Sequence, residues 1–250
     1  MRSFLTFLRE LGDCPQQYPT LVEGVYDPGI LKCVFMAGGP GSGKSTKAEE
    51  LFGLDAGFKS SFSHYGLKVV NSDHMFEFLL KQMDVSPKEL ARIERDQPEK
   101  FAFLTQDPAG PRARAKALTT HQQELYMQGR LGMIIDGTGD DYAKIANKKS
   151  HIEAKGYDTA MVFVHTSLEV ALERNRSRSR VLPDELVKDI WQSCQHNRDA
   201  YRRLFGRHYI EVYNTTGGVS HPVVQHAVQV FVHQPIQNPK GKEWIQSHTQ

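Results

Sequence analysis

The residues whose types and spacing are most suited to chemistry form a glycine-rich run, Gly38 to Thr46, which fits G-x-x-x-x-G-K-[ST] at every position. Glycines let backbone N–H groups turn inward around phosphate oxygens. Lys44 would reach the β- and γ-phosphates as a point charge, and the Ser45 hydroxyl would ligate Mg²⁺. The run predicts a site for ATP or another NTP, formed by Gly38, Gly39, Pro40, Gly41, Ser42, Gly43, Lys44, Ser45 and Thr46.

A carboxylate suited to general-base catalysis, Asp73, follows the apolar segment Val69-Val70. At the end of a strand beside the phosphates, it could accept the proton of an attacked hydroxyl. The alternative is structural, because Asn-Ser-Asp before a helix is a common capping sequence in which Ser72 or Asp73 would be the cap. We expect Asp73 to be the base, and Asp140 or Asp141 are the next candidates.

Four arginines alternate with other residues at Arg174, Arg176, Arg178 and Arg180. Alternate positions cannot share one helical face, so the helix that precedes them is expected to end here and open into a lid, about 174–183. Guanidinium forks suit phosphate oxygens and stabilise charge that develops during phosphoryl transfer. A solvated basic turn would explain one or two of the four, but not the whole set.

The elements that must position these residues alternate between short apolar runs and helical stretches, which indicates an α/β fold with a parallel sheet flanked by helices. Five strands are predicted at Leu31–Ala37, Leu67–Asn71, Gly132–Asp136, Thr159–His165 and His208–Tyr213. Helices are predicted at 44–53, 74–83, 87–95, 113–129, 140–155, 167–177, 184–204 and 219–233. Parallel strands bring their carboxyl ends to one edge of the sheet, where ligands bind.

Three parts of the chain are expected: an N-terminal arm at 1–30, a P-loop domain at 31–234 and a loosely ordered tail at 235–250, of which Trp244 and Ile245 could dock back on the domain. A proline-rich stretch between the second and third strands predicts a helical insertion, about 84–130. Hydrophobic content of 39% and charged content of 24% are ordinary for a soluble protein, and no apolar run is long enough to cross a membrane. Three cysteines without metal-ligand spacing and no secretory signal predict a cytoplasmic protein.

Three classes of P-loop protein compete. Motor and AAA-type ATPases usually follow the acidic strand with a water-activating glutamate, whereas Asp136 is followed by Gly137. A GTPase switch would need N-K-x-D, and the segment 147–150 lacks the final aspartate. A kinase needs a base and cations, and both are present, so we predict a phosphotransferase. A nucleotide-dependent binding switch, which would tolerate changes at Asp73, is the alternative from another class.

These residues resemble the kinase domain of phage polynucleotide kinases and of the related zeta-toxin-like kinases, from about Leu31 to Asn214. Four sequence motifs match in the same order along the chain: the P-loop, Asn71-x-Asp73, Asp136-x-Thr138, and the lid Arg174-Asn175-x-x-Arg178 followed by Pro183. The resemblance implies that Asp73 is the general base and that Arg178 contacts the transferred phosphoryl group. It also implies that Arg174 lies near the base or the α/β-phosphates of the nucleotide, and that Asp136 supports Mg²⁺ through water.

The sequence also departs from this pattern. Polynucleotide kinases carry an arginine three residues after the base, to hold the acceptor's phosphate, and Phe76 stands there instead. Zeta toxins phosphorylate a nucleotide sugar, and their E-G-T resembles Asp136-Gly137-Thr138. The overall sequence pattern is also similar to that of kinases of tailed phages, including those proposed to phosphorylate 5-hydroxymethyluracil within DNA.

The acceptor is expected to contact the insertion. Arg112, Arg114 and Lys116 lie at a predicted helix start, where cations are electrostatically unfavourable and therefore need a reason. Such cations position nucleic acid without reading its sequence. Five aromatic side chains in the insertion or just before it are either stacking surfaces for a base or part of the core: Phe76, Phe78, Phe101, Phe103 and Tyr126. Nucleic acid (DNA) is the first expectation for the acceptor, and a nucleotide or nucleotide sugar is the second.

Overall fold

The computed structural model describes residues 24–25, 27, 29–54, 63–178, 181–215 and 222–249. Its five strands are β1 (Lys32–Ala37), β2 (Lys68–Val70), β3 (Met133–Asp136), β4 (Asp158–His165) and β5 (Tyr209–Tyr213). They form one sheet in the order β2-β3-β1-β4-β5, and every neighbouring pair is parallel. The predicted five-stranded parallel sheet is confirmed, and each strand lies within a residue of its predicted bounds.

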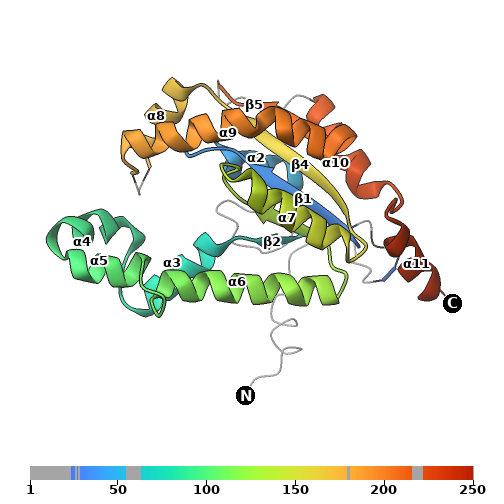
Figure 1. Cartoon of the computed structure of the whole chain (residues 1–250), viewed down its shortest axis with the longest axis horizontal. Coiled ribbons are helices and arrows are strands. Elements are labelled where there is room, and N and C mark those ends of the chain that lie inside the picture. The colour runs from blue at the N-terminus through green and yellow to red at the C-terminus, as the bar shows by residue number, and fades with distance from the viewer. Residues whose placement is uncertain are drawn as a thin grey trace, which may run out of the picture.

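The central strand β1 is buried along its whole length because helices cover both faces of the sheet. Val34 and Met36 point into one core, with α2 (Lys44–Phe52) and α10 (Pro222–His233). Cys33 and Phe35 point into the other, with α7 (Tyr142–Glu153) and α9 (Asp184–Phe205) (Figure 1). This alternation holds the carboxyl end of β1, and hence the glycine-rich loop, at a rigid edge.

The segment between β2 and β3, fully described, contains α3 (Ser72–Gln82), a 3₁₀ turn (Pro87–Glu89), α4 (Leu90–Asp96), α5 (Pro98–Thr105) and α6 (Pro111–Gln128). These helices share a small core of their own: Phe76, Leu80, Val85, Leu90, Ile93, Leu104 and Ala115. Figure 1 shows α4 and α5 set away from the sheet, beyond α3 and α6. Because α3 packs in this core, the helical unit begins at Ser72, earlier than the predicted boundary near 84.

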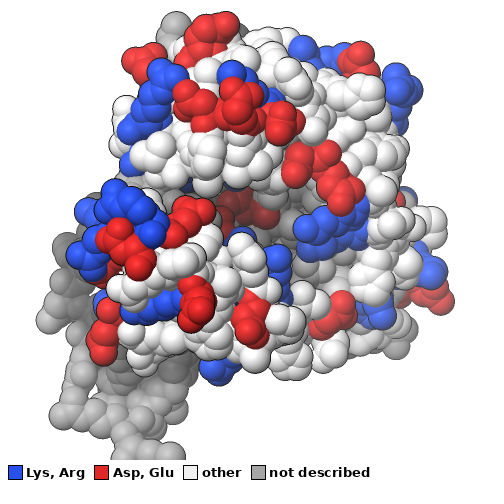
Figure 2. Space-filling model, turned by 60° about the vertical axis from the view of Figure 1, so that its left-hand side comes forward, with Lys and Arg blue, Asp and Glu red and all other residues white. Residues whose placement is uncertain are grey.

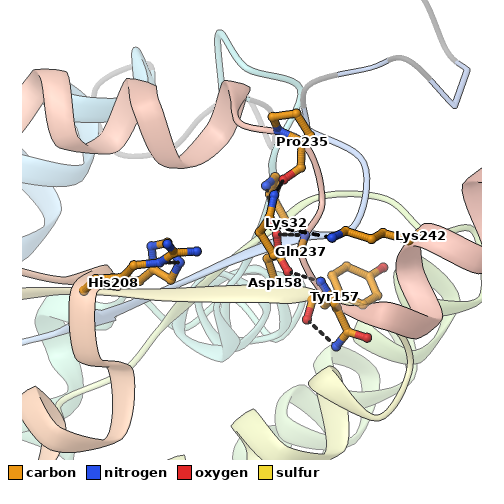
Figure 3. Close-up of polar contacts among 9 residues, drawn as sticks. Lys32, Tyr157, Asp158, His208, Pro235, Gln237 and Lys242 are labelled. Carbon is orange, nitrogen blue, oxygen red and sulfur yellow. Dashed lines mark hydrogen bonds and ion pairs between the residues drawn. The ribbon is translucent and has the colours of Figure 1, made fainter.

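The C-terminal residues are not the loosely ordered extension that we expected. They include α11 (Pro239–Ser247), and Trp244 and Ile245 pack against the sheet's second core. The connection before α11 is held by Asp158, which accepts hydrogen bonds from the backbone N–H groups of Gln237 and Asn238, both at 2.8 Å. Asp158 also accepts one from Lys32 Nζ at 3.1 Å, and Figure 3 shows Lys32 and Gln237 beside Asp158.

Several predictions fall on residues outside this description: most of the N-terminal arm, Arg180 of the lid and the start of the helix predicted at 219–233. Within the described part of the chain, no helix is long and apolar enough to cross a membrane.

Candidate active site

The glycine-rich loop joins β1 to α2 in a shape that side chains would obstruct. Gly41 and Gly43 both have a positive φ, 75° and 77°, which glycine adopts without strain. A Cβ at Gly41 would lie 2.2 Å from the carbonyl oxygen of Ala171, and one at Gly43 would lie 2.2 Å from Asn214 Nδ2. Both positions therefore require glycine for conformation and for space.

The residues present fit a triphosphate. The loop lines a cavity of about 460 Å³ that extends from Gly38 to Thr46 and reaches Arg174 and Arg178 of the lid. Inside the loop, the hydroxyl of Ser42 is buried without a hydrogen-bond partner among the described residues. Such orphaned groups are uncommon in folded proteins, and a phosphate oxygen is a partner that would satisfy it.

Lys44 and Asp136 meet behind this loop. Lys44 Nζ lies 2.6 Å from Asp136 Oδ1, and Asn71 Nδ2 donates to Asp136 Oδ2 at 2.8 Å. Ser45 stands exposed in the first turn of α2 and lines the cavity that would hold the triphosphate. A hydroxyl and a carboxylate are oxygen ligands of the kind that Mg²⁺ accepts together with phosphate oxygens, so this donor set fits the metal.

Asp73 lies in the first turn of α3, and the residue that caps this helix is Asn71. Asn71 Oδ1 accepts a hydrogen bond from the backbone N–H of Asp73 at 2.7 Å. The alternative in which Ser72 or Asp73 is the cap is therefore wrong. Because Asn71 caps the helix, the Asp73 carboxylate is not needed as a cap. It is 59% exposed and pairs with Arg112 Nη1 of α6 at 2.7 Å.

A second cavity, of about 530 Å³, adjoins the first. It lies between the carboxyl ends of β2 and β3, the start of α3, and the helices α6 and α7. The linings of the two cavities share Lys44, Asp73, Arg112 and Thr138. Figure 2 looks into the hollow between the sheet-bearing body and the insertion, and both acidic and basic side chains surround it. The arrangement offers one chamber for a donor, one for an acceptor, and a carboxylate at their junction.

The lid arginines separate into different environments. The helix α8 (Leu168–Arg176) ends where predicted, and Arg174 Nη1 donates to the carbonyl oxygen of Asn214 at 2.9 Å, beside the glycine-rich loop. Arg176 instead forms an ion pair with Asp184, away from the cavity, which matches the solvated-turn alternative. Arg178 is exposed and lines the triphosphate cavity.

The structure decides between the two alternatives for Phe76 and separates Arg114 from Arg112. Phe76 is 2% exposed and belongs to the core of the helical unit, with the guanidinium of Arg112 5.2 Å from its ring centre, so no base can stack on it. Arg114 lines neither cavity, because two residues along a helix turn a side chain about 200° from Arg112. Lys116, one turn beyond Arg112, does line the second cavity.

The sequence analysis assigned no role to several residues of this site, Asn175 of the lid motif among them. Asn175 is buried and bonds to both backbone groups of Leu182, donating at 2.7 Å and accepting at 3.1 Å, and so closes the lid loop. Thr119 and Gln123 line the second cavity. The available signal was helical spacing: 112, 116, 119 and 123 fall on one face of a helix.

Residues 33–200 match a family model described as an AAA domain. A cytidylate kinase from Methanopyrus kandleri is 21% identical over 177 residues, which cover 71% of this chain and 78% of the relative. Among solved structures, the AvrRxo1-ORF1:-ORF2 complex with ATP has a TM-score of 0.50 at 14% identity, covering 90% of this chain and 67% of that one. The shikimate kinase of Acinetobacter baumannii in complex with shikimate has a TM-score of 0.44 at 16% identity, covering 84% and 97%.

Proposed function

The chain belongs to the AAA domain family and is a P-loop kinase, and we propose that it transfers the γ-phosphoryl group of ATP to a hydroxyl of a small anionic molecule. The observation that carries this proposal is the meeting of the two cavities at Lys44, Asp73, Arg112 and Thr138. Gly137 in place of a water-activating glutamate further supports transfer to an acceptor rather than ATP hydrolysis.

In the proposed mechanism, the Asp73 carboxylate accepts a hydrogen bond from the acceptor hydroxyl and takes its proton as the hydroxyl oxygen bonds to the γ-phosphorus. The bond from that phosphorus to the bridging oxygen breaks, and ADP leaves. Lys44 and Arg178 offset the charge on the transferred group. Mg²⁺, which Ser45 and Asp136 would hold, neutralises phosphate charge when bound.

Two features support a small acceptor. A volume of about 530 Å³ lies within the range of small-molecule sites, about 300–1,000 Å³. Arg112, Lys116, Lys144 and Lys148 line the cavity, so an anion would meet complementary charge there. The cytidylate kinase to which the chain is similar is named for an acceptor of this kind, and the AvrRxo1-ORF1 complex was solved with ATP.

Nucleic acid, our first expectation from the sequence, becomes the second candidate. The observation in its favour is that Arg114 and Lys116 are exposed next to Arg112, where they could contact a polynucleotide backbone. A DNA end with a 5′-hydroxyl, or a hydroxymethyl group on a pyrimidine, would then reach Asp73 as a single nucleotide. The burial of Phe76 removes one of the contacts that this acceptor was expected to use.

The deciding experiment offers γ-labelled ATP to the purified protein with a panel of acceptors: nucleoside monophosphates, UDP-sugars, 5′-hydroxyl oligonucleotides and hydroxymethyluracil DNA. Wild type and Asp73→Asn are compared throughout. Label on a small acceptor, lost in Asp73→Asn, is the expected result. Label only on DNA would replace the small acceptor by the second candidate. Tight ATP binding with no labelled acceptor, and no change in Asp73→Asn, would favour the non-catalytic switch.

A further inference from the structure

One face of α6 runs the length of the acceptor cavity. Four residues on this face line the cavity: Arg112, Lys116, Thr119 and Gln123. At a rise of 1.5 Å per residue, Arg112 and Gln123 are about 16 Å apart along the helix axis. Since Arg112 contacts Asp73, Gln123 marks the end of the cavity that is remote from phosphoryl transfer. An acceptor that filled only the reacting end, where its hydroxyl is attacked, would make no contact with this remote end of the cavity.

A lysine from the neighbouring helix closes the remote end. Lys148 of α7 is partly buried, and its Nζ donates to Gln123 Oε1 at 3.1 Å. Burial lowers the pKa of Lys148, and the nearby charge of Lys144 lowers it further. In the part of the chain that the structure describes, no carboxylate forms an ion pair with Lys116, Lys144 or Lys148. A partly buried ammonium paired only with a neutral amide pays part of the desolvation cost without a counter-charge, and an anionic ligand would offset that cost.

A buried hydroxyl at the same end also lacks a partner. Thr119 is 7% exposed and lines the cavity, and its Oγ1 accepts or donates no hydrogen bond within the described residues. A threonine inside a helix can bond to the carbonyl four residues earlier, but Thr119 makes no such bond. An oxygen atom of a ligand in the cavity would satisfy this hydroxyl.

The carboxylates that line the cavity are engaged at its other end. Asp73 pairs with Arg112, Asp136 pairs with Lys44, and Asp140 accepts a hydrogen bond from the Thr138 hydroxyl. Asp141 caps α7, and Lys148 lies seven residues beyond it, about 10 Å along the helix axis. The cavity therefore has its acidic groups at the reacting end and the Lys148 ammonium with the Thr119 hydroxyl at the remote end. Lys144, three residues beyond Asp141, lies between the two ends.

We propose that Thr119, Gln123 and Lys148, with Lys116 and Lys144 beside them, bind a phosphate group of the acceptor. The acceptor is then a hydroxyl compound whose phosphate lies on the order of 10 Å from the attacked hydroxyl, the axial separation of Arg112 and Thr119. Ammonium groups and a hydroxyl suit a phosphate, which offers three acceptor oxygens and does not need the planar fork of an arginine. This inference rests on the proposed function, because it assigns the second cavity to the acceptor.

The test measures inorganic phosphate binding directly, by calorimetry and by the shift in melting temperature, with a non-hydrolysable ATP analogue and Mg²⁺ saturating the glycine-rich loop. Acetate at equal ionic strength is the comparison for a carboxylate ligand. The variants are Lys148→Met and Thr119→Val, and the matched control is Lys155→Met, an exposed lysine that lines neither cavity. The melting temperature of each variant without phosphate checks that it is folded.

We expect phosphate to bind wild type and Lys155→Met equally, and Lys148→Met about tenfold or more weakly, from the loss of one charge-assisted hydrogen bond. Thr119→Val should weaken phosphate binding to a smaller extent. Equal phosphate affinity in wild type, Lys148→Met and Thr119→Val would overturn the proposal, as would equal or tighter binding of acetate. If phosphate does not bind but the protein still transfers label from ATP to an acceptor, only this inference is overturned. If phosphate binds as expected but no acceptor is labelled, the proposed function is overturned.

Discussion

Asp73 Oδ1 and Arg112 Nη1 lie 2.7 Å apart, although thirty-nine residues separate them in the chain. The contact joins the first turn of α3 to the first turn of α6 at the carboxyl edge of the sheet. It also explains a cation at the start of α6, where the helix dipole disfavours positive charge: the carboxylate opposite offsets that cost. If the second cavity holds the acceptor, as we propose, Arg112 lies at its reacting end, whether the acceptor is large or small.

The variant Asp73→Asn separates catalysis from structure. Because Asn71 is the cap of α3 and the Asp73 side chain is 59% exposed, we expect the free energy of unfolding to fall by no more than about 1 kcal/mol. Turnover should fall by roughly 10² or more, the scale for loss of a positioned base. Steady-state kinetics and urea unfolding measure the two effects. Near-wild-type turnover would remove Asp73 as the base and redirect attention to Asp140 and Asp141.

Asn71 links two parts of the site, and two variants divide its roles. Asn71→Ser keeps a cap but removes the donor to Asp136, whereas Asn71→Ala removes both. Both should raise the Mg²⁺ concentration needed for half-maximal activity, since Asp136 loses orientation. Only Asn71→Ala should lose about 1 kcal/mol of unfolding free energy. Identical metal titrations in wild type and Asn71→Ser would show that the Asn71–Asp136 bond does not orient a metal ligand.

Lys44→Ala should abolish phosphoryl transfer and weaken triphosphate binding, because the loop loses the cation that its shape presents to the β/γ oxygens. Nucleotide binding is measured with a fluorescent ATP analogue, and transfer with labelled ATP. Lys44 is also the ion-pair partner of Asp136, so the melting temperature of the variant is measured as well, to check that it is folded. Activity within a few-fold of wild type in a folded variant would contradict the triphosphate site.

Two lid arginines form a matched pair, since Arg178 lines the triphosphate cavity and Arg176 is held by Asp184. Arg178→Ala should lower kcat by about 10² or more with little change in ATP affinity, if its guanidinium meets charge that develops during transfer. Arg176→Ala should leave kcat within a few-fold of wild type. A higher KM for the acceptor with unchanged kcat in Arg178→Ala would make Arg178 a docking residue instead.

The ion pair beneath α11 predicts an asymmetry in stability. Asp158→Asn leaves Lys32, which is 1% exposed, without its counter-charge and should cost about 3–5 kcal/mol. Lys32→Met should cost less, because Asp158 keeps two backbone N–H donors. Burial already lowers the pKa of Lys32 in wild type, and loss of the Asp158 charge lowers it further.

The pH dependence of that variant follows from this shift. Between the lowered pKa of Lys32 in the folded state and about 10.5 in the unfolded state, the unfolded chain binds more protons, so stability rises with pH. The deficit of Asp158→Asn should therefore narrow as pH rises toward 10.5. A deficit that stays constant over this range in urea unfolding would show that Lys32 is not the source of the cost.

Local patterns in the sequence were sufficient for the sheet and the phosphate loop. Each strand is a short buried apolar run, and the loop's glycines, lysine and serine act together because they are contiguous along the chain. The pairing of Asp73 with Arg112 and of Gln123 with Lys148, and the separation of Arg176 from Arg178, were decided only by tertiary structure. Such distances depend on how α3, α6 and α7 pack against one edge of the sheet, and on which way each helix turns its side chains. Apolar periodicity determines which face of a helix is buried, but not which polar residue of another element stands opposite its exposed face.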